Sequence, residues 1–342
     1  MRIPSYNHEK YINDCISSIL NQTFQDFEII ITDDCSTDGT VDVIRQFDDP
    51  RINLEVLERN CGMNVAVAHC MKRCSGKYIA NMCSDDVWHP EKLEKQVRFL
   101  EENASYDAVF TRVDLVNEKG RALKSIRYAL YPPFGCKNKE PHEWLRHFFY
   151  NGNCLCNPSV LIKREVYEKY GYQDKRLLSL SDFDLWIKLS FEHSFFILDE
   201  KLTSFRMRSG KKNVSAATKK ARNRGSFEYK QILDNYLIIK DTQTLLKIFP
   251  ECIKYGEPQD AVIPYFLGRL ALDTKIVFKK LWGLEKIYTM MDDEGLSRIL
   301  EEQYDFRYAD LIKLTGNINV FYVSRASSLA AKIKTKTQNR GK

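Results

Sequence analysis

The sequence predicts an α/β fold in which a mostly parallel sheet is flanked by helices and followed by a C-terminal helical extension. In the first half of the chain, short apolar runs with strand character alternate with stretches of helical periodicity. That alternation is typical of parallel sheets whose strands are joined by helices. Beyond about residue 215, helical periodicity continues almost without interruption to about residue 331.

The elements of the first half can be assigned in order. Strands are expected at residues 27–34, 52–58, 77–84 and 107–116. Helices are expected between them, at residues 9–21, 40–47, 64–74 and 90–102. Pro90 and Glu91 suit the first turn of the last of these helices. Further helices are expected at 142–150 and 180–193, and a further strand at 194–200.

These patterns divide the chain into residues 1–215, a helical extension at 216–331 and a basic tail at 332–342. The formal net charge is +6, and residues 324–342 contain six lysines and arginines and no acid. The rest of the chain is therefore close to neutral, which excludes the broad basic surface of a nucleic-acid-binding protein. The tail could contact anionic lipid weakly or form a solvated, frayed end.

The ten cysteines are irregularly spaced, without a CxxC pair or a histidine at zinc spacing. We expect them to be reduced core residues of a cytoplasmic protein, peripheral to the inner face of the membrane at most. Cys154 and Cys156 form a lone CxC, which is weak evidence for any site. No apolar run approaches the length of about 20 residues that a membrane span requires.

Two pairs of adjacent aspartates end expected strands: Asp33 with Asp34, and Asp85 with Asp86. Because ligands bind at the carboxyl ends of parallel strands, both pairs should face one site. Adjacent carboxylates repel, so either a divalent cation or plain solvent must offset their charge. Together they suit a nucleotide on one side and a diphosphate bound to Mg²⁺ or Mn²⁺ on the other.

The run "TDDCSTDGT" places Asp34, Ser36, Asp38 and Gly39 as in the start of a calcium-binding loop. Position twelve is Arg45 instead of glutamate, which rejects an EF-hand. What remains is a strand-to-helix turn in which Gly39 supplies backbone freedom. A Walker loop, a Gly-x-Gly-x-x-Gly motif and a nucleophile elbow are all absent from the sequence.

Three motifs in order carry a resemblance to a known family. The runs "IPSYNHEKYINDCISSILNQTFQDFEIIITDDCSTDGT", "RNCGMNVAVAHCMKRCSGKYIANMCSDDVWHPEKL" and "SDFDLW" resemble the family 2 glycosyltransferases with the GT-A fold. The resemblance covers roughly residues 2–215. It implies transfer of a sugar from a nucleotide-diphosphate donor to an acceptor hydroxyl, with inversion.

The resemblance also implies roles for individual residues. Asp86 would ligate the metal, and Asp182 would be the general base. Within the donor site, Tyr6 and Asp34 would contact the base, Asp33 would support the turn and Asp85 would lie near the ribose. The residues expected to form this donor site are Pro4, Tyr6, Asp33, Asp34, Asp85 and Arg208.

The role of Asp182 can also be argued physically. Inverting transfer needs one carboxylate to take the proton of the acceptor while a metal stabilises the departing diphosphate. Alternatively, Asp182 could merely cap the helix that buries Leu185, Trp186 and Leu189. Asp184 lies on another face of that helix and is the weaker candidate.

The sequence departs from the family pattern at three internal positions. Ala66, Val67 and Ala68 stand where Ala-Arg-Asn is usual, so an arginine that often faces the donor is missing. Ser181 replaces the customary acid before Asp182. Arg208 stands where histidine is common, and its guanidinium cannot ligate a metal but could bind diphosphate in bidentate fashion.

A fourth departure concerns the start of the chain. Only Met1, Arg2 and Ile3 precede Pro4, where the family has an apolar first strand. The sequence therefore predicts that most of this central strand is missing and that the sheet is destabilised by several kcal/mol.

These observations favour a metal-dependent inverting glycosyltransferase that uses a UDP-sugar. Its acceptor would be a saccharide or glycolipid of bacterial surface polysaccharide synthesis, a setting that rests on the resemblance alone. The alternative is a non-catalytic module that binds nucleotide sugar or glycan. A nucleotidyltransferase is a third reading, but its glycine-rich phosphate loop is absent.

Overall fold

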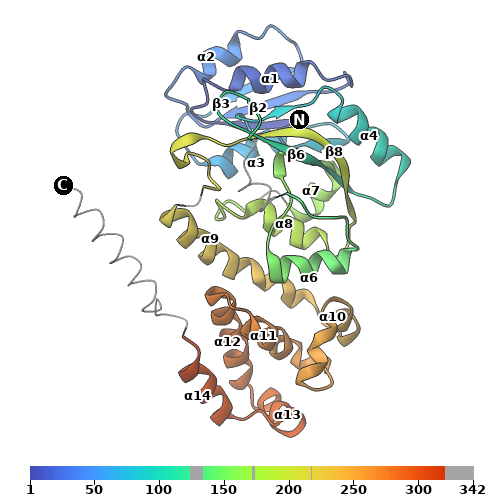
Figure 1. Ribbon diagram of the computed structural model, residues 1–342, viewed down its shortest axis with the longest axis vertical. Coiled ribbons are helices and arrows are strands. Elements are labelled where there is room, and N and C mark those ends of the chain that lie inside the picture. The colour runs from blue at the N-terminus through green and yellow to red at the C-terminus, as the bar shows by residue number, and fades with distance from the viewer. Residues whose placement is uncertain (124–133, 172–173, 217, 320–342) are drawn as a thin grey trace, which may run out of the picture. The chain divides into compact units, whose positions relative to one another are not determined.

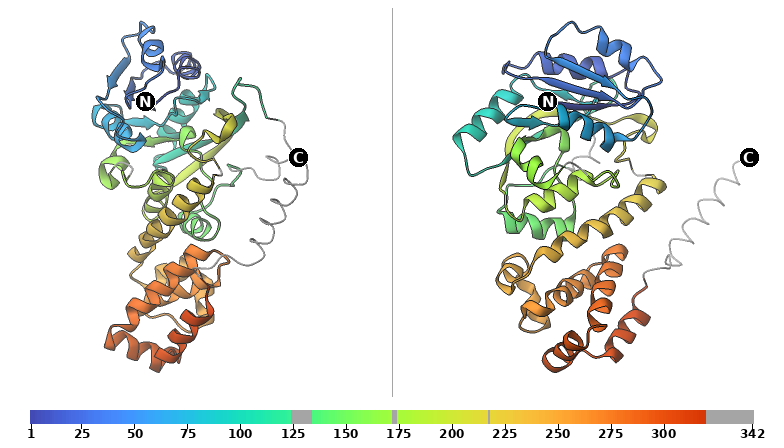
Figure 2. Two further views of the ribbon diagram at one scale, coloured as in Figure 1. Left: turned by 90° about the vertical axis from the view of Figure 1, so that its left-hand side faces the viewer. Right: turned by 180° about the vertical axis from the view of Figure 1, so that it is seen from behind.

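The computed structural model describes residues 1–123, 134–171, 174–216 and 218–319 of the 342-residue chain. It divides into two compact units, Met1–Asn235 and Tyr236–Lys342. The first unit contains every described strand, and the described part of the second is helical (Figures 1 and 2). The predicted α/β class with a C-terminal helical extension is confirmed. The basic tail at 332–342 lies outside the described residues.

The first three strands form a parallel sheet in the order β1-β2-β3. They are β1 (Arg2–Ser5), β2 (Ile29–Asp33) and β3 (Ile52–Val56). The helices that connect and follow them are α1 (Ile12–Leu20), α2 (Thr40–Arg45) and α3 (Met63–Arg73). In Figure 1, α1 and α2 lie above this sheet and α3 lies below it, so both faces are covered.

The first strand is present, and the prediction that most of it is missing is wrong. Strand β1 pairs with β2 from Arg2 opposite Ile30 to Ser5 opposite Asp33. On its other side, the carbonyl of Arg2 accepts a hydrogen bond of 3.1 Å from the Met82 amide. The prediction counted only the residues before Pro4, but Pro4 and Ser5 are themselves part of the strand, and four residues are enough to pair with β2 along its length.

A second, mixed sheet follows in the order β4-β7-β6-β8-β5, with β6 and β8 parallel and the other neighbours antiparallel. A parallel bridge between Arg2 and Asn81 connects the two sheets. Its strands are β4 (Tyr78–Ala80), β5 (Val87–Trp88), β6 (Ala108–Val116), β7 (Leu161–Lys163) and β8 (Phe195–Arg206). The remaining α-helices of the first unit are α4 (Lys92–Glu102), α6 (Pro141–Asn151), α7 (Arg164–Tyr170), α8 (Ser181–Leu189) and α9 (Lys219–Ile232).

Buried aromatic side chains fix α6 and α8 against the second sheet. Trp144 of α6 lies 4.9 Å from Phe195 of β8, measured between ring centroids. Trp186 of α8 lies 5.0 Å from Phe110 of β6, edge to face. Aromatic pairs at these separations add stability beyond the area they bury. They place the start of α8, where Asp182 lies, in a rigid setting.

The first unit extends past residue 215, where the sequence predicted the boundary, because α9 belongs to it. The buried carboxylate of Glu228 on α9 accepts hydrogen bonds from the backbone amides of Leu178, Ser179 and Leu180, at 2.8 to 2.9 Å. These contacts are long-range in sequence. The local change to helical periodicity therefore did not mark the end of the compact unit.

The second unit is built from short helices around one close crossing. The α-helices are α10 (Thr242–Ile248), α11 (Ile263–Asp273), α12 (Val277–Met291), α13 (Glu294–Tyr304) and α14 (Tyr308–Asn317). A Cβ atom on Gly283 of α12 would lie 2.5 Å from the carbonyl oxygen of Gly268 on α11. The two helices can approach this closely only because both positions are glycine. Within the described residues, no helix is long and apolar enough to cross a bilayer.

Short 3₁₀ helices occupy several connections in both units. They are η1 (Asn157–Ser159), η2 (Ser209–Lys211), η3 (Leu233–Ile238), η4 (Pro250–Tyr255) and η5 (Asp260–Val262).

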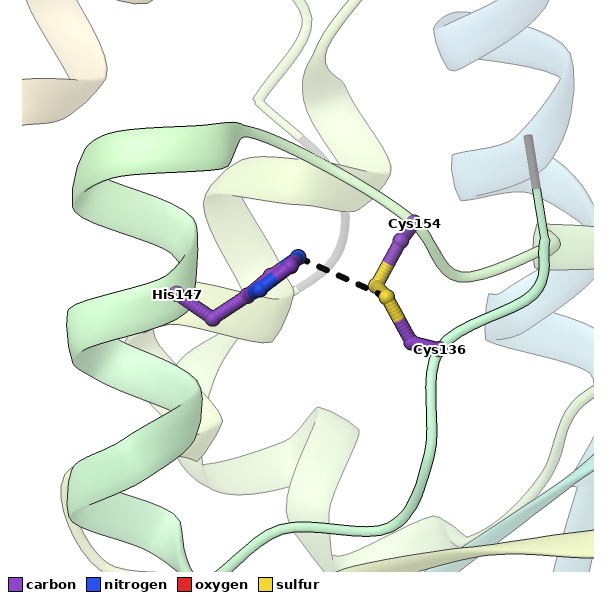
Figure 3. Close-up of side chains that lie close together, drawn as sticks. All are labelled: Cys136, His147 and Cys154. Carbon is purple, nitrogen blue, oxygen red and sulfur yellow. Dashed lines mark hydrogen bonds between the residues drawn. A yellow bond between two sulfur atoms is a disulfide. The ribbon is translucent and has the colours of Figure 1, made fainter. Parts of the chain in front are cut away.

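The expectation that all ten cysteines are reduced is wrong for one pair. Cys136 and Cys154 form a disulfide, with Cα atoms 6.2 Å apart, beside His147 (Figure 3). The other eight cysteines form no disulfide, and five of these are buried. The two bonded residues lie on either side of α6, and their approach depends on how that helix folds back on the sheet.

Candidate active site

A cavity of about 890 Å³ opens at the carboxyl ends of β1 and β2 and at the turn after β4. All of its lining residues belong to the first unit. Seven of the eight residues that the sequence assigned to the site line it: Pro4, Tyr6, Asp34, Asp85, Asp86, Asp182 and Arg208. The eighth, Asp33, is fully buried behind the wall.

The loops after β1 and β2 are joined by a ladder of hydrogen bonds. The Asn7 amide donates to Ser36 Oγ at 2.8 Å, and the Asn7 side chain accepts from the Thr37 amide at 2.8 Å. Glu9 Oε2 accepts from the Gly39 amide at 2.7 Å. The rim of the cavity is thus fixed by residues separated by about thirty positions in sequence.

Gly39 does not supply the backbone freedom that the sequence suggested, because its φ of −73° suits any residue. Its role is close approach, since a Cβ atom there would lie 3.0 Å from Glu9 Oε2. The left-handed backbone in this loop belongs instead to Cys35, with φ of 61°.

Both carboxylates of the first aspartate pair have donors. Asp33 accepts hydrogen bonds from Ser5 Oγ at 2.6 Å, and from the Ser36 amide and Oγ at 2.7 Å. Asp34 accepts from the amides of Cys61 and Gly62, at 2.6 and 2.8 Å. Asp33 therefore ties β1 to the turn after β2, and Asp34 holds the start of α3.

The neighbouring wall is formed by Pro4 and Tyr6 from the end of β1. The Tyr6 side chain is 43% exposed and borders the cavity beside Asp34. Ala66 of α3, which corresponds to the alanine of the usual Ala-Arg-Asn, is buried and presents only a methyl group to the cavity.

The second pair of aspartates is bonded differently. Asp86 is 1% exposed; its Oδ1 accepts the Arg206 amide at 2.8 Å, while its Oδ2 has no hydrogen-bond partner among the described residues. Burial, and then the charge of Asp85, raise the pKa of the Asp86 carboxyl well above its usual range. The oxygens of both aspartates and the Cys83 sulfur lie within 4.8 Å of one another.

This geometry fits a divalent cation. A buried carboxylate oxygen without a donor, beside a second carboxylate, is a ligand set that Mg²⁺ or Mn²⁺ accepts, with other positions left to oxygens of water or phosphate. Asp86 would be the principal ligand, and Asp85 would contribute charge.

The sequence did not point to Arg206, the residue that holds this turn in place. Its guanidinium is 1% exposed and donates to the carbonyls of Asp85 and Glu118 at 2.7 Å, and to Asp14 Oδ2 at 3.0 Å. The strand that ends at Arg206 also carries Asp199, Glu200 and Lys201, so the sequence offered no signal that singled out this charged side chain.

Arg208, two residues further on, faces the cavity. Its Nε forms an ion pair of 3.1 Å with Asp85 Oδ2, and its Nη1 donates to His8 Nε2 at 2.6 Å. Because a guanidinium can only donate, His8 accepts through Nε2 and donates through Nδ1 to Ser84 Oγ, 2.7 Å away. Burial also lowers the pKa of His8, which favours this neutral form.

Asp182 lies in the first turn of α8. It is far from Asp85 and Asp86 in the sequence, but all three residues line the same cavity. Its Oδ1 accepts the Phe183 amide at 2.8 Å. Burial raises the pKa of its carboxyl to about 6. A carboxylate with such a pKa can accept a proton from a hydroxyl near neutral pH.

Two nearby acids have structural partners. Asp184 accepts from Lys188 Nζ at 2.6 Å and from Asn235 Nδ2 at 2.7 Å, and it does not line the cavity. Glu228 binds the three amides that precede α8. One oxygen of Asp182 accepts a hydrogen bond in the first turn of α8. The three backbone amides that precede the helix donate to Glu228 instead.

A parallel sheet whose strand ends meet at an acidic cavity is the arrangement of α/β proteins that bind a nucleotide at the carboxyl ends of their strands. Residues 2–171 match the family model for glycosyl transferase family 2. An uncharacterized glycosyltransferase of Methanocaldococcus jannaschii is 32% identical over 208 residues, which cover 59% of this chain and 68% of that protein. The chain therefore belongs to glycosyl transferase family 2, and it is an enzyme that uses a nucleotide-sugar donor.

Two relatives from Bacillus subtilis are also similar. The putative glycosyltransferase EpsE is 30% identical over 254 residues, covering 71% of this chain and 81% of EpsE. The putative teichuronic acid biosynthesis glycosyltransferase TuaG is 41% identical over 128 residues, covering 37% of this chain and 50% of TuaG. The match thus spans half the length of TuaG. Family membership decides against the non-catalytic module and the nucleotidyltransferase.

The fold is also that of a solved glycosyltransferase. The crystal structure of Staphylococcus aureus TarS 1–349 in complex with UDP superimposes with a TM-score of 0.54 at 19% identity. The match covers 89% of this chain and 90% of that one.

Proposed function

We propose that this enzyme transfers a sugar with inversion from a UDP-sugar to a hydroxyl of a saccharide or glycolipid acceptor, and that it requires Mg²⁺ or Mn²⁺. The observation that carries the proposal is the buried Oδ2 of Asp86, which has no donor within the described residues and belongs to a cavity that Asp182 also lines. The Asp86 carboxylate is thus suited to bind a cation, and the Asp182 carboxylate is suited to accept a proton.

The donor end of the cavity would be the side of β1 and β2. Tyr6 offers an exposed ring beside Asp34, whose oxygens keep lone pairs for a donor group of the base. Pro4 would complete this wall, and Asp33 would hold the turn from behind. Asp85 would lie near the ribose.

Asp86 would hold the cation, which when bound would neutralise negative charge on the leaving diphosphate. Arg208 supplies a positive charge to the wall of the same cavity. Its guanidinium could exchange its ion pair with Asp85 for a bidentate contact to phosphate, since Arg suits that geometry.

Asp182 would act as the base. The acceptor hydroxyl would donate its proton to the carboxylate as its oxygen attacks the anomeric carbon from the side opposite the diphosphate. A single displacement of this kind inverts the configuration, and it needs no second carboxylate as nucleophile. Ser181, which replaces an acid before Asp182, leaves that carboxylate as the base of the acceptor side.

Two relatives support the proposed acceptor class. TuaG is a putative teichuronic acid biosynthesis glycosyltransferase, and an O-antigen biosynthesis glycosyltransferase of Escherichia coli is 30% identical over 190 residues. We therefore place the reaction in synthesis of bacterial surface polysaccharide. The buried cysteines that form no disulfide favour the reducing cytoplasm.

Thermal unfolding with candidate ligands tests the donor and the cation together. UDP and UDP-sugars should raise the melting temperature in the presence of Mn²⁺ and have little effect with EDTA, since a ligand at 100 times its Kd stabilises by about 2.7 kcal/mol. GDP at the same concentration should stabilise less. Stabilisation by UDP that is equal with Mn²⁺ and with EDTA would overturn the metal requirement.

A matched variant ties the effect to the acidic turn. Asp86→Asn should lose the Mn²⁺-dependent part of the stabilisation, whereas Asp42→Asn, on the exposed side of α2, should keep it. Donor hydrolysis and product configuration, followed by NMR, then report transfer chemistry and inversion separately from binding.

A further inference from the structure

Away from the proposed donor and acceptor groups, three side chains of the first unit gather around one point. Cys136 precedes α6, His147 lies on α6, and Cys154 follows it (Figure 3). Their sulfur and nitrogen ligand atoms all lie within 4.8 Å of one another, and Cys136 Sγ lies 3.4 Å from His147 Nε2. All three side chains are partly buried.

We propose that Cys136, His147 and Cys154 bind a thiophilic divalent cation of the zinc class when the disulfide between the two cysteines is reduced. Thiolate sulfur and imidazole nitrogen are the ligands that zinc prefers, at about 2.3 Å and 2.0 to 2.1 Å. A shift of the two sulfurs away from each other would make room for the ion between them and the ring. Three protein ligands leave the fourth position to water.

The segments that carry the ligands are held independently of the disulfide. The Cys136 carbonyl accepts a hydrogen bond from Arg112 of β6. Two residues on, the Asn138 side chain exchanges hydrogen bonds of 2.7 and 3.0 Å with the backbone of Ile197 on β8. A site held in this way is partly preorganised, because its geometry does not depend on the metal alone.

Helix α6 is held equally well. It begins with a capping box between Glu140 and Glu143, and it buries Trp144 and Phe148 against the sheet. His147 is therefore presented from a fixed helix. Its Nε2 points toward the sulfurs in Figure 3.

The chemistry balances with a dithiol reductant. The reductant supplies two electrons and two protons, becomes a cyclic disulfide, and converts the Cys136–Cys154 bond into two thiols. Binding of the cation to both sulfurs then releases the two thiol protons. Oxidised and metal-bound forms are mutually exclusive, since each uses the same two sulfurs.

The site would bear on the cavity, because Cys154 is flanked by two residues that line it. Asn153 and Leu155 both belong to the cavity wall, and Asn153 also forms a side-chain hydrogen bond with Asp182. Phe134, two residues before Cys136, lines the cavity as well. Both the disulfide and a metal bound by the same two cysteines would hold these segments together.

The test uses the full chain in an Asp86→Asn background, which weakens the other candidate cluster around Cys83. The protein is reduced with dithiothreitol, desalted anaerobically, incubated with Zn²⁺ and desalted again, and retained metal is counted by mass spectrometry. We expect about one equivalent in the reduced protein and none in the disulfide-bonded protein. Zn²⁺ should also protect Cys136 and Cys154 from alkylation, as read by peptide mapping.

Ligand variants distinguish the site from adventitious binding. His147→Gln should weaken Zn²⁺ at least about tenfold while leaving the disulfide able to form, and Cys136→Ser should abolish retention. Cys61→Ser, which removes an exposed free thiol, is the matched control and should retain the metal. Absence of retained zinc in the reduced protein, or retention unchanged by His147→Gln, would overturn the proposal.

Discussion

The two pairs of adjacent aspartates look alike in the sequence and differ in the folded protein. Asp33 and Asp34 end β2, and every described contact of their carboxylates is with a hydroxyl or amide donor. Asp85 and Asp86 lie in the turn after β4. There, one buried oxygen of Asp86 lacks a donor within the described chain, and burial raises the pKa of its carboxyl.

This difference in hydrogen-bond donors distinguishes acids that hold the fold together from acids that are available to bind a ligand. Donors around a carboxylate compensate its charge within the fold, so the first pair can hold loops together without help. The second pair carries charge that the fold compensates only in part, through the ion pair of Asp85 with Arg208 and the hydrogen bond from the Arg206 amide to Asp86. A buried oxygen left without a donor is costly, and a bound cation would offset that cost.

The largest effect is expected at Asp86. Asp86→Asn should lower sugar transfer roughly 10³-fold, because it removes the charge expected to hold the cation at the leaving group. The same change should leave the melting temperature without ligand equal or higher, since an uncompensated buried charge is lost. Initial rates with Mn²⁺ and calorimetric melting check both parts. A variant that melts much earlier would make Asp86 a structural acid like Asp33, and the comparison would fail.

Asp182 resembles Asp86 in having a pKa raised by burial, and it should show the next largest effect. Asp182→Asn should reduce turnover roughly 10²-fold while leaving UDP binding intact. Because the base must be ionised, kcat/KM of the wild type should fall as pH drops below about 6.

The same pKa has a consequence for stability. Between about pH 4 and 6 the folded Asp182 carboxyl holds a proton that the unfolded chain has released, so its contribution to stability declines as pH rises through that window. Asp182→Asn should flatten this slope in urea unfolding. A wild-type rate profile without an acid limb near pH 6 would move the role of base elsewhere.

Asp33 should respond in the opposite way to Asp86. Asp33→Ala should lower the free energy of unfolding by about 2 kcal/mol or more, because the Ser5 hydroxyl and the Ser36 amide lose their acceptor in a buried place. The loss should be the same with EDTA and with Mn²⁺. Chemical unfolding measures it, with the exposed Asp42→Ala as control. An effect confined to the metal-loaded protein would contradict a purely structural role.

The smallest effect is expected at Gly39, in the turn that Asp33 supports. Gly39→Ala should cost about 1 kcal/mol or less, since its backbone is ordinary and the atom it meets belongs to the flexible Glu9 side chain. A second change, Glu9→Ala, removes the atom that the new Cβ would meet and tests whether that contact is the cause. If Gly39→Ala destabilises as strongly as Asp33→Ala, the loop is more rigid than its hydrogen bonds imply.

The sequence predicted the placement of both acid pairs because that inference used only local periodicity and one topological rule. Strands end where their apolar runs end, and the ends of parallel strands meet at one edge. It could not tell the pairs apart. Their difference depends on donors from Ser5 and Gly62 in one case and Arg206 in the other, which are brought near only by the fold.

Other features were missed for related reasons. The first strand was predicted to be mostly missing because only three residues precede Pro4, although Pro4 and Ser5 themselves pair with β2 in the sheet. The Cys136–Cys154 disulfide joins segments on either side of α6, and spacing alone does not reveal that they meet. In each case the deciding contact lies between residues far apart in the chain.

Glu228 has a consequence for how such enzymes are divided into interchangeable parts. Its carboxylate holds the backbone just before Asp182, and Asn235 holds Asp184 on the same helix. A polypeptide cut at the apparent boundary near residue 215 would therefore lose the support of its own proposed base. The boundary between the two compact units lies after Asn235. A different C-terminal unit joined there would leave the contacts that support that base in place. Residues 216–235 therefore belong with the first unit, although their helical periodicity resembles that of the helices beyond them.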